Sequence, residues 1–129
     1  MSSIVLDSSA ALAMILGEPG GVIVMDAFLR QDETIAISAV NWSEVLVRMQ
    51  REMDGFEVGT LGALLPGAEV VPFGQAEAEA TARLALDCSS LSLGDRACLA
   101  LAKHRNTAAW TTDKIWARMN TGTELRLLR

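Results

Sequence analysis

The feature of this sequence that most constrains its fold is an alternation of short apolar runs with longer helical segments. The apolar runs predict strands at residues 3–6, 34–37, 68–73, 108–112 and 125–128. The intervening patterns predict helices at residues 8–16, 22–30, 39–53, 55–65, 75–86 and 95–105, with a short helix from residue 114. Strands joined by helical segments of about ten residues form parallel sheets with helices on both faces. The sequence therefore predicts an α/β fold.

The chain is long enough to bury a substantial core, and its 129 residues suit a single domain over residues 1–129. Apolar residues make up 50% of the chain before its ten glycines are counted. In a typical domain, apolar residues and glycine together make up about 45–50%. Because a small domain cannot bury such a surplus, we expect part of it to form a face for a partner. The apolar segments at residues 12–29 and 58–65 are the candidates.

The sequence carries no signal for a membrane or for export. No apolar run approaches the roughly 18–20 residues that span a bilayer, and no basic segment followed by an apolar one opens the chain. Cys88 and Cys98 lie ten residues apart, without a C-x-x-C pair or a histidine at metal-binding spacing. We therefore expect buried, reduced thiols in a cytoplasmic protein with no membrane contact.

The net charge of −5 is distributed unevenly. Residues 1–87 hold 13 acidic and 4 basic side chains, net −9, whereas residues 88–129 hold 3 acidic and 7 basic side chains, net +4. The acidic total argues against a nonspecific polyanion binder. The basic last third offers several cations to phosphates, although scattered solubilising charge explains them equally well. These cations are Lys103, Arg105, Lys114, Arg118, Arg126 and Arg129.

Four acidic residues stand where strands end and helices begin. Asp7 and Asp113 each follow directly after an apolar run. Asp95 opens a predicted helix, and Glu44 lies in the second turn of the helix that follows the second strand. In a parallel sheet, the carboxyl ends of all strands and the helix starts after them meet at one edge, where α/β proteins bind ligands. We therefore expect these four carboxylates to converge.

Each acid also has a purely structural interpretation. Aspartates are common N-caps, and Asp95 follows Ser92 at the spacing of a capping box. Glu44 precedes Arg48 by four residues, which is the spacing of a surface ion pair. Taken one at a time, the acids are explained by helix capping and surface charge as well as by a functional site.

Convergence of the four acids would have a chemical consequence. Two like charges about 4 Å apart repel by roughly 4 kcal/mol at an effective dielectric constant near 20, a cost that a proton or a cation must relieve. Oxygen ligands without histidine or thiolate suit Mg²⁺ or Mn²⁺ rather than zinc. Such a site suits phosphoryl chemistry, because a bound ion lowers the pKa of water and stabilises a leaving oxygen.

The four acidic segments together resemble those of PIN-domain ribonucleases, and the chain as a whole is similar to the VapC toxins of bacterial toxin–antitoxin pairs. The resemblance rests on residues 5–9, 37–44, 91–102 and 111–113, in that order. It implies a three-layer sandwich with a parallel sheet of four to five strands in the order 3-2-1-4-5. It also implies RNA cleavage with one or two Mg²⁺ or Mn²⁺ ions, inhibition by a VapB-like antitoxin, and a homodimer that forms a heterotetramer or larger assembly with that antitoxin.

The resemblance also assigns roles to individual residues. Asp7, Glu44, Asp95 and Asp113 correspond to the acidic quartet that holds the metal and performs catalysis. Asp7 and Asp95 would be metal ligands, Glu44 would bind metal or orient water, and Asp113 would act directly or through a water. Ser8 and Thr111 would donate hydrogen bonds to these acids. His104, in the last turn of its helix, is interpreted as a partner of the helix dipole.

Two other functions remain open from the sequence. One is a phosphatase of the haloacid-dehalogenase type, which also places an aspartate after its first strand. That family needs a second aspartate two residues later, where this chain has Ser9. The other is a PIN-like module without catalytic activity, which binds a partner and dimerises. Measured RNA cleavage distinguishes that module from a nuclease, because both could bind metal.

Overall fold

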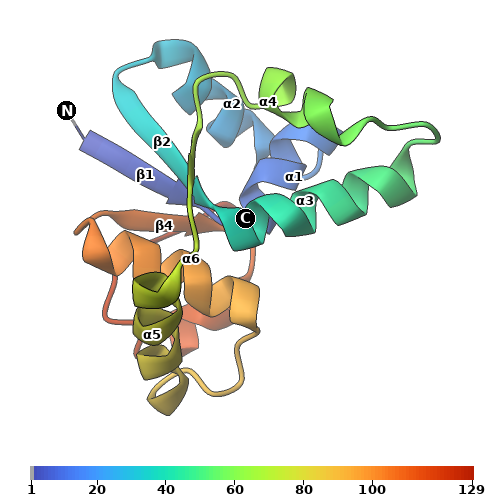
Figure 1. Cartoon of the computed structure of the whole chain (residues 1–129). Coiled ribbons are helices and arrows are strands. Elements are labelled where there is room, and N and C mark those ends of the chain that lie inside the picture. Colours follow the sequence, from blue (N-terminus) through green and yellow to red (C-terminus); the bar gives the residue numbers. More distant parts are fainter. Residues whose placement is uncertain (1) are drawn as a thin grey trace.

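The computed structural model describes residues 2–129 and is built around a parallel sheet of five strands (Figure 1). The strands lie in the spatial order β3-β2-β1-β4-β5, and every neighbouring pair is parallel. The α/β class and the sheet order expected from the sequence are thus confirmed. The strands are β1 (Ser2–Leu6), β2 (Glu33–Ser38), β3 (Glu69–Val71), β4 (Ala108–Thr111) and β5 (Leu125–Leu127).

Helices connect the strands and cover both faces of the sheet (Figure 1). The α-helices are α1 (Ser8–Leu16), α2 (Gly21–Arg30), α3 (Ala39–Glu52), α4 (Leu61–Leu64), α5 (Gln75–Arg83) and α6 (Leu93–His104). Three 3-10 segments complete the connections, namely η1 (Val58–Thr60), η2 (Leu84–Leu86) and η3 (Lys114–Arg118).

Two predicted helices differ from the structure. The prediction of a continuous helix at residues 55–65 is wrong, because that segment forms only η1 and the single turn α4. Three glycines in this segment, at positions 55, 59 and 62, weaken a continuous helix. The helix expected to open at Asp95 begins instead at Leu93, with Ser92 as its N-cap, so Asp95 lies within the first turn.

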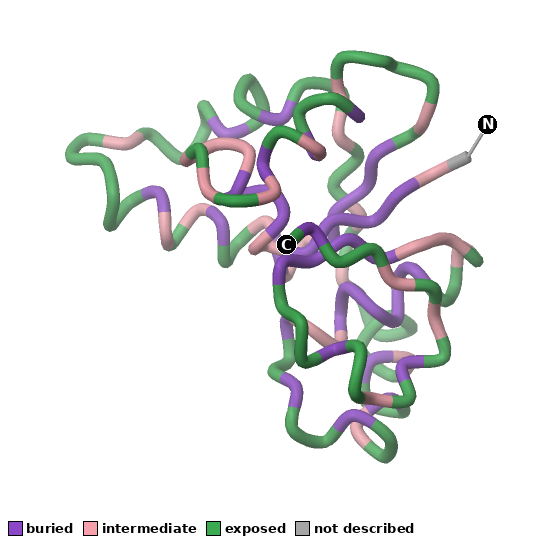
Figure 2. The backbone as a smooth tube through the Cα atoms, turned by 180° about the vertical axis from the view of Figure 1, so that it is seen from behind, coloured by how far each residue is buried: buried purple, intermediate pink, exposed green. Residues whose placement is uncertain are grey.

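The core has two parts, one on each face of the sheet. Neighbouring residues of β1 point to opposite faces, so Leu6 packs in one part and Val5 in the other. Residues of α1 to α4 complete the first part, and residues of η2, α6 and η3 complete the second. The buried strands run between these two parts (Figure 2). This arrangement is the expected three-layer sandwich.

The carboxyl ends of the central strands β1, β2 and β4 lie together at one edge of the sheet. Leu6 at the end of β1 is in register with Ile37 of β2 and with Trp110 of β4. The backbone N–H of Asp7 continues the ladder beyond β1 by donating to the carbonyl of Trp110 at 3.1 Å. The residues that follow these strands are therefore held side by side.

Membrane-spanning potential is low in the described part of the chain. No single helix within residues 2–129 has the length and apolar character to cross a bilayer. Only α1 and α2 taken together reach that length, and a 90° bend separates them.

Candidate active site

The carboxylate of Asp7 lies at the centre of the candidate site and is almost fully buried, with 2% of the residue exposed. Its Oδ1 accepts hydrogen bonds from Ser9 Oγ at 2.7 Å and from the backbone N–H of Ala10 at 2.8 Å. Its Oδ2 accepts from Thr111 Oγ1 at 2.6 Å. Three donors thus fix the carboxylate at the start of α1 and join it to the end of β4.

Burial nevertheless raises the pKa of Asp7 from 3.8 to about 6. The hydrogen bonds from Thr111, Ser9 and Ala10 act in the opposite direction, and the negative charge of Asp95 raises the pKa further. A helix-capping carboxylate in solvent has no such penalty, because its hydrogen bonds favour the charged form. Asp7 does cap α1, but capping alone does not explain why a carboxylate is buried beside another acid.

Two hydroxyl groups connect Asp7 to the segment that carries Asp113. Thr111 Oγ1 also accepts the backbone N–H of Asp113 at 3.0 Å, so one threonine joins both acids. Ser9 Oγ accepts the backbone N–H of Thr112 at 3.0 Å while donating to Asp7. Thr111 therefore makes the contact expected of it.

The hydroxyl donor expected at Ser8 is corrected to Ser9. Within residues 2–129, Ser8 makes no side-chain hydrogen bond to Asp7, whereas Ser9 does. The reason is local: Asp7 is the N-cap of α1, and its carboxylate turns toward the second and third residues of the helix. The N-cap pattern in the sequence contains the signal for this choice, because capping side chains reach two or three residues ahead.

Asp95 links the other acids electrostatically. Burial raises the pKa of this half-buried carboxyl, and hydrogen bonds involving Ser92 oppose that shift. The charges of Asp113 and Glu44 raise the Asp95 pKa further, while Asp95 itself raises the pKa of Asp7. The structure therefore brings all four predicted acids close enough for their charges to interact. Asp113 and Glu44 are both exposed, and Asp113 caps η3 by accepting the backbone N–H of Ile115 at 3.1 Å.

Glu44 is held by an asparagine and a glycine that sequence reasoning did not single out. The buried Asn41 Nδ2 donates to Glu44 Oε1 at 2.9 Å and to the carbonyl of Gly94 at 3.0 Å. A methyl group on Gly94 would overlap the Glu44 carboxylate. The absence of a side chain at Gly94 thus lets a carboxylate from α3 lie against the first turn of α6. The i, i+3 spacing of Asn41 and Glu44 in the sequence was the signal that could have indicated their contact.

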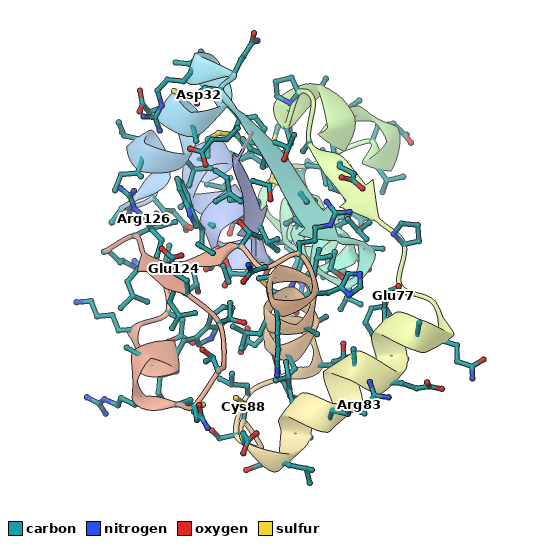
Figure 3. All side chains as sticks on the ribbon, turned by 90° about the vertical axis from the view of Figure 1, so that its left-hand side faces the viewer. Asp32, Glu77, Arg83, Cys88, Glu124 and Arg126 are labelled. Atoms are coloured by element: carbon teal, nitrogen blue, oxygen red, sulfur yellow. The ribbon has the colours of Figure 1, made fainter. Side chains whose placement is uncertain are left out.

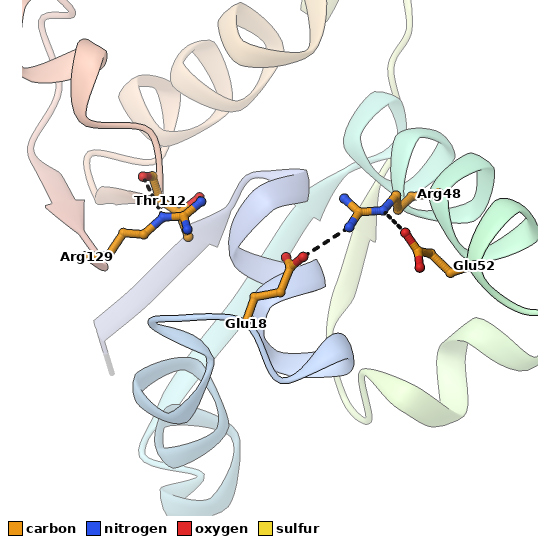
Figure 4. A network of polar contacts seen from close by, with 5 residues as sticks. All are labelled: Glu18, Arg48, Glu52, Thr112 and Arg129. Atoms are coloured by element: carbon orange, nitrogen blue, oxygen red, sulfur yellow. Dashed lines mark hydrogen bonds and ion pairs between the residues drawn. The ribbon is translucent and has the colours of Figure 1, made fainter.

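The ion pair between Glu44 and Arg48, which offered a structural explanation for Glu44, is not formed. Arg48 instead bridges Glu18 at 3.0 Å and Glu52 at 2.8 Å, as Figure 4 shows. Its guanidinium therefore ties the loop after α1 to α3. Arg48 therefore does not neutralise the negative charge of Glu44, which acts on the site.

The carboxylate oxygens fit a hard divalent cation that is bound by few protein ligands and keeps part of its water shell. Within residues 2–129, no three acidic, histidine or cysteine side chains enclose an ion by themselves. Mg²⁺ commonly keeps several waters and takes only one or two protein carboxylates, so an open group of acids suits it. Cys98 is fully buried behind the acids, and burial with their negative charges raises its pKa well above 9.0. The four acids themselves offer only oxygen ligands.

Fold and site together define a class of protein: a parallel α/β domain with four interacting carboxylates at the carboxyl edge of its sheet. The family model of the PIN domain matches residues 4–121, so this chain belongs to the PIN-domain family. No curated protein matches the chain significantly in sequence.

Solved structures with this fold include proteins of bacterial toxin–antitoxin systems. DNA-bound VapBC from Salmonella typhimurium is similar with a TM-score of 0.77 at 17% identity, over 100% of both chains. A toxin–antitoxin complex from Klebsiella pneumoniae is similar with a TM-score of 0.74 at 21% identity, over 98% of each chain. VapC20 of Mycobacterium tuberculosis, described as a sarcin–ricin loop cleaving toxin, has a TM-score of 0.70 at 14% identity, over 89% of this chain and 93% of that one. Likenesses at these identities establish the fold.

The buried Asp7 should make the metal-free protein less stable as the pH rises. Its pKa of about 6 in the folded protein exceeds the ordinary value of 3.8, so between these values the folded state binds more protons than the unfolded state. Stability from this group is present below about pH 4, falls through the window, and is lost above about pH 6. Asp7→Asn protein should lack this loss, which is on the order of 2–3 kcal/mol.

Urea unfolding in EDTA across this pH window measures the effect. Asp32→Asn is the matched control, because Asp32 is an exposed acid outside the site. The control should keep the wild-type pH dependence, whereas Asp7→Asn should show a flatter profile. Parallel profiles for wild type and Asp7→Asn would show that Asp7 is not the group responsible.

Proposed function

We propose that this protein is a metal-dependent endoribonuclease that acts as the toxin of a toxin–antitoxin pair. The observation that carries the proposal is the burial of Asp7 beside Asp95, with Glu44 and Asp113 close enough for their charges to act on Asp95. Repulsion between neighbouring carboxylates destabilises a fold, and a bound cation relieves it. A cluster of this kind is therefore typical of a cation site. Membership of the PIN-domain family and the sarcin–ricin loop cleavage named for VapC20 support RNA as the substrate.

The residues of the site divide into ligands and groups that hold the ligands. Asp7 and Asp95 would hold Mg²⁺ or Mn²⁺, with Asp113 contributing directly or through water. When bound, the ion lowers the pKa of a water and neutralises charge on the phosphodiester. Glu44, held by Asn41, would bind the metal or orient the attacking water and accept its proton at a carboxylate oxygen. Thr111 fixes the orientation of Asp7.

Basic residues near the site support binding of a polyanion despite the acidic cluster. Arg129 donates to the carbonyl and the hydroxyl of Thr112 at 3.4 and 3.3 Å, as Figure 4 shows. Thr112 directly precedes Asp113, so a guanidinium lies at the margin of the acids. Within residues 2–129, Arg129 pairs with no carboxylate. Its charge is therefore available to RNA phosphates on either side of the cleaved bond.

An exposed apolar face supports binding of an antitoxin. On α2, Val22 is 80% exposed and Leu29 is 74% exposed, and Met25 lies on the same helix at 46%. Exposed apolar residues also lie on α3, at its C-cap, on η1 and on α4, namely Val47, Met53, Val58 and Leu64. Patches of this kind mark protein interaction sites. The residues of α2, η1 and α4 fall within the two segments expected from the sequence, whereas Val47 and Met53 lie outside both, and Leu12, at the start of the first segment, is buried.

We propose that a small VapB-like antitoxin covers this face and inhibits cleavage. The assemblies named for the Salmonella and Klebsiella structures support such a partner. The toxin would form a homodimer, and with antitoxin a heterotetramer or larger assembly. The complex would reside in the cytoplasm, where its RNA substrates are.

Of the two alternatives, the haloacid-dehalogenase interpretation is wrong, because the chain belongs to the PIN-domain family. The module without catalytic activity remains the second candidate, since an exposed apolar face serves a binding module equally well. Measured RNA cleavage decides between it and the nuclease.

The central prediction is RNA cleavage that depends on a divalent ion. Purified protein incubated with total cellular RNA should produce defined 5′ ends with Mg²⁺ or Mn²⁺ and none in EDTA. Asp7→Asn protein should be at least about 100-fold less active, whereas Asp32→Asn should match wild type. Undiminished cleavage by Asp7→Asn protein, or by wild type in EDTA, would overturn the proposal. Tight metal binding without any cleavage would favour the non-catalytic module.

A methyl group at Gly94 should impair the site without unfolding the protein. Because it would overlap the Glu44 carboxylate, Gly94→Ala should displace Glu44 and slow cleavage by roughly 10–100-fold, as is usual when a supporting contact of a metal site is lost. Gly62→Ala is the matched control, since a methyl group there meets no atom within 4 Å. Melting curves verify that both variants fold. Equal cleavage rates for the two variants would exclude a role for Glu44.

Charge introduced on the exposed apolar face should block the antitoxin but not catalysis. We expect Val22→Asp and Leu29→Asp proteins to cleave RNA at the wild-type rate and to resist inhibition by the cognate antitoxin. Leu86→Asp is the matched control, because Leu86 is 89% exposed on η2, away from this face. Inhibition titrations measure the effect. If Leu86→Asp alone escapes inhibition, the antitoxin binds elsewhere.

A further inference from the structure

A cavity of about 380 Å³ lies between α5, α6 and the carboxyl end of β3. Short side chains leave this space open, with Ala76 and Ala80 on the α5 side and Ala97 and Ala100 on the α6 side. Figure 3 shows α5 beside α6, with Glu77 toward the end of α5 near β3. The volume falls at the lower end of the range for small-molecule sites, about 300–1,000 Å³.

A buried hydroxyl without a partner lines this cavity. Thr81 is 2% exposed, and within residues 2–129 its Oγ1 makes no hydrogen bond. A helical threonine usually satisfies its hydroxyl on the carbonyl one turn earlier, and Thr81 does not. A buried polar group without a partner is unfavourable, so a ligand in the cavity that reaches this hydroxyl would relieve an existing cost.

The other polar groups of the cavity favour an uncharged planar ligand. Phe73 and His104 supply ring side chains to its lining. Arg105 also lines it, but its charge is neutralised by a two-point ion pair with Glu69 at 2.8 Å for each contact. The cavity therefore lacks the free guanidinium that a phosphate would require, while it has the rings on which RNA-binding proteins stack single bases.

The cavity shares α6 and the start of α3 with the acidic site, although Asp95 and Ala97 lie on different sides of α6. Ala97 follows Asp95 by two residues on α6, and Ser38, which also lines the cavity, caps the helix that carries Glu44. From Ala97 to His104 the helix rises about 10 Å, at roughly 1.5 Å per residue. A strand of RNA with one phosphate at the acids could thus place a neighbouring base in the cavity.

We propose that this cavity binds one unstacked base of the RNA substrate and thereby selects where the strand is cleaved. The proposal rests on the nuclease function proposed above. The base lies between Phe73 and His104, and its edge exchanges a hydrogen bond with the Thr81 hydroxyl. Glu77, whose Oε1 already accepts the backbone N–H of Gly74 at 2.9 Å, retains a second oxygen for a base N–H.

Two substitutions test the cavity. Ala100→Leu fills it, and Thr81→Val removes the hydroxyl at nearly constant shape. On the RNA that wild type cleaves best, each should lower kcat/KM by about tenfold or more, in line with the loss of one stacked base. Each should also broaden the base preference at one fixed position in the map of 5′ ends. The matched controls are Ala78→Leu on the exposed side of α5 and Thr123→Val, which also loses an unpartnered hydroxyl. Both controls should behave as wild type.

A second measurement is independent of catalysis. The four ribonucleosides are titrated into wild-type protein, and the methyl resonances of Thr81 and Ala100 are followed by NMR. At least one nucleoside should shift both methyl groups, and Ala100→Leu should abolish the shift at Thr81. If wild type cleaves no RNA, the proposed function fails, and this titration still decides whether the cavity binds a base.

Three results would overturn the inference. The first is an unchanged cleavage map and rate for both cavity variants. The second is the absence of any nucleoside-dependent shift at Thr81. The third is a change in oligomeric state, measured by light scattering, with the same cleavage sites, because the cavity would then receive a second copy of the chain.

Discussion

The burial of the Asp7 carboxylate is the interaction on which the rest of the site depends. Placing a carboxylate at 2% exposure carries a desolvation cost, which the raised pKa of about 6 reflects. The surrounding hydrogen bonds lower that cost but do not remove it. They come from α1 and from the end of β4, so the adjacency of β1 and β4 in the sheet is what makes the burial tolerable. A cation would remove the remaining cost.

The other acids reach Asp7 because the elements behind them pack closely. Asp95 is carried by α6, whose buried residues form the core on one face of the sheet. Glu44 is carried by α3, which packs on the opposite face. The two helices start at the same edge and meet where Gly94 has no side chain and Asn41 bridges them. The acid cluster is thus the point at which the two outer layers of the sandwich contact each other across the end of the sheet.

Much of this arrangement follows from the sequence, for identifiable reasons. The alternation of strands and helices indicates a parallel sheet, and parallel connections place every acid at the same edge. The strand order came from the family resemblance, since periodicity alone does not determine it. Two of the misses concern individual atoms rather than whole elements. Choosing Ser9 over Ser8 requires the direction in which an N-cap side chain turns, and the role of Gly94 requires a tertiary contact 50 residues away along the chain.

The helix predicted at residues 55–65 does not form for a different reason, and the reason bears on function. A segment with three glycines gains little from helix propensity, and here it forms η1 and α4, held mainly by Leu61 and Leu65 in the core. Its remaining apolar side chains stay on the surface and are exposed, like those of α2. The base cavity lies in the other outer layer, between α5 and α6. The proposed antitoxin face and the proposed base site therefore lie in opposite outer layers, with the acids between them. An antitoxin bound over α2 and α4 could then inhibit cleavage by neutralising or covering the acids, without ever occupying the cavity that selects the RNA.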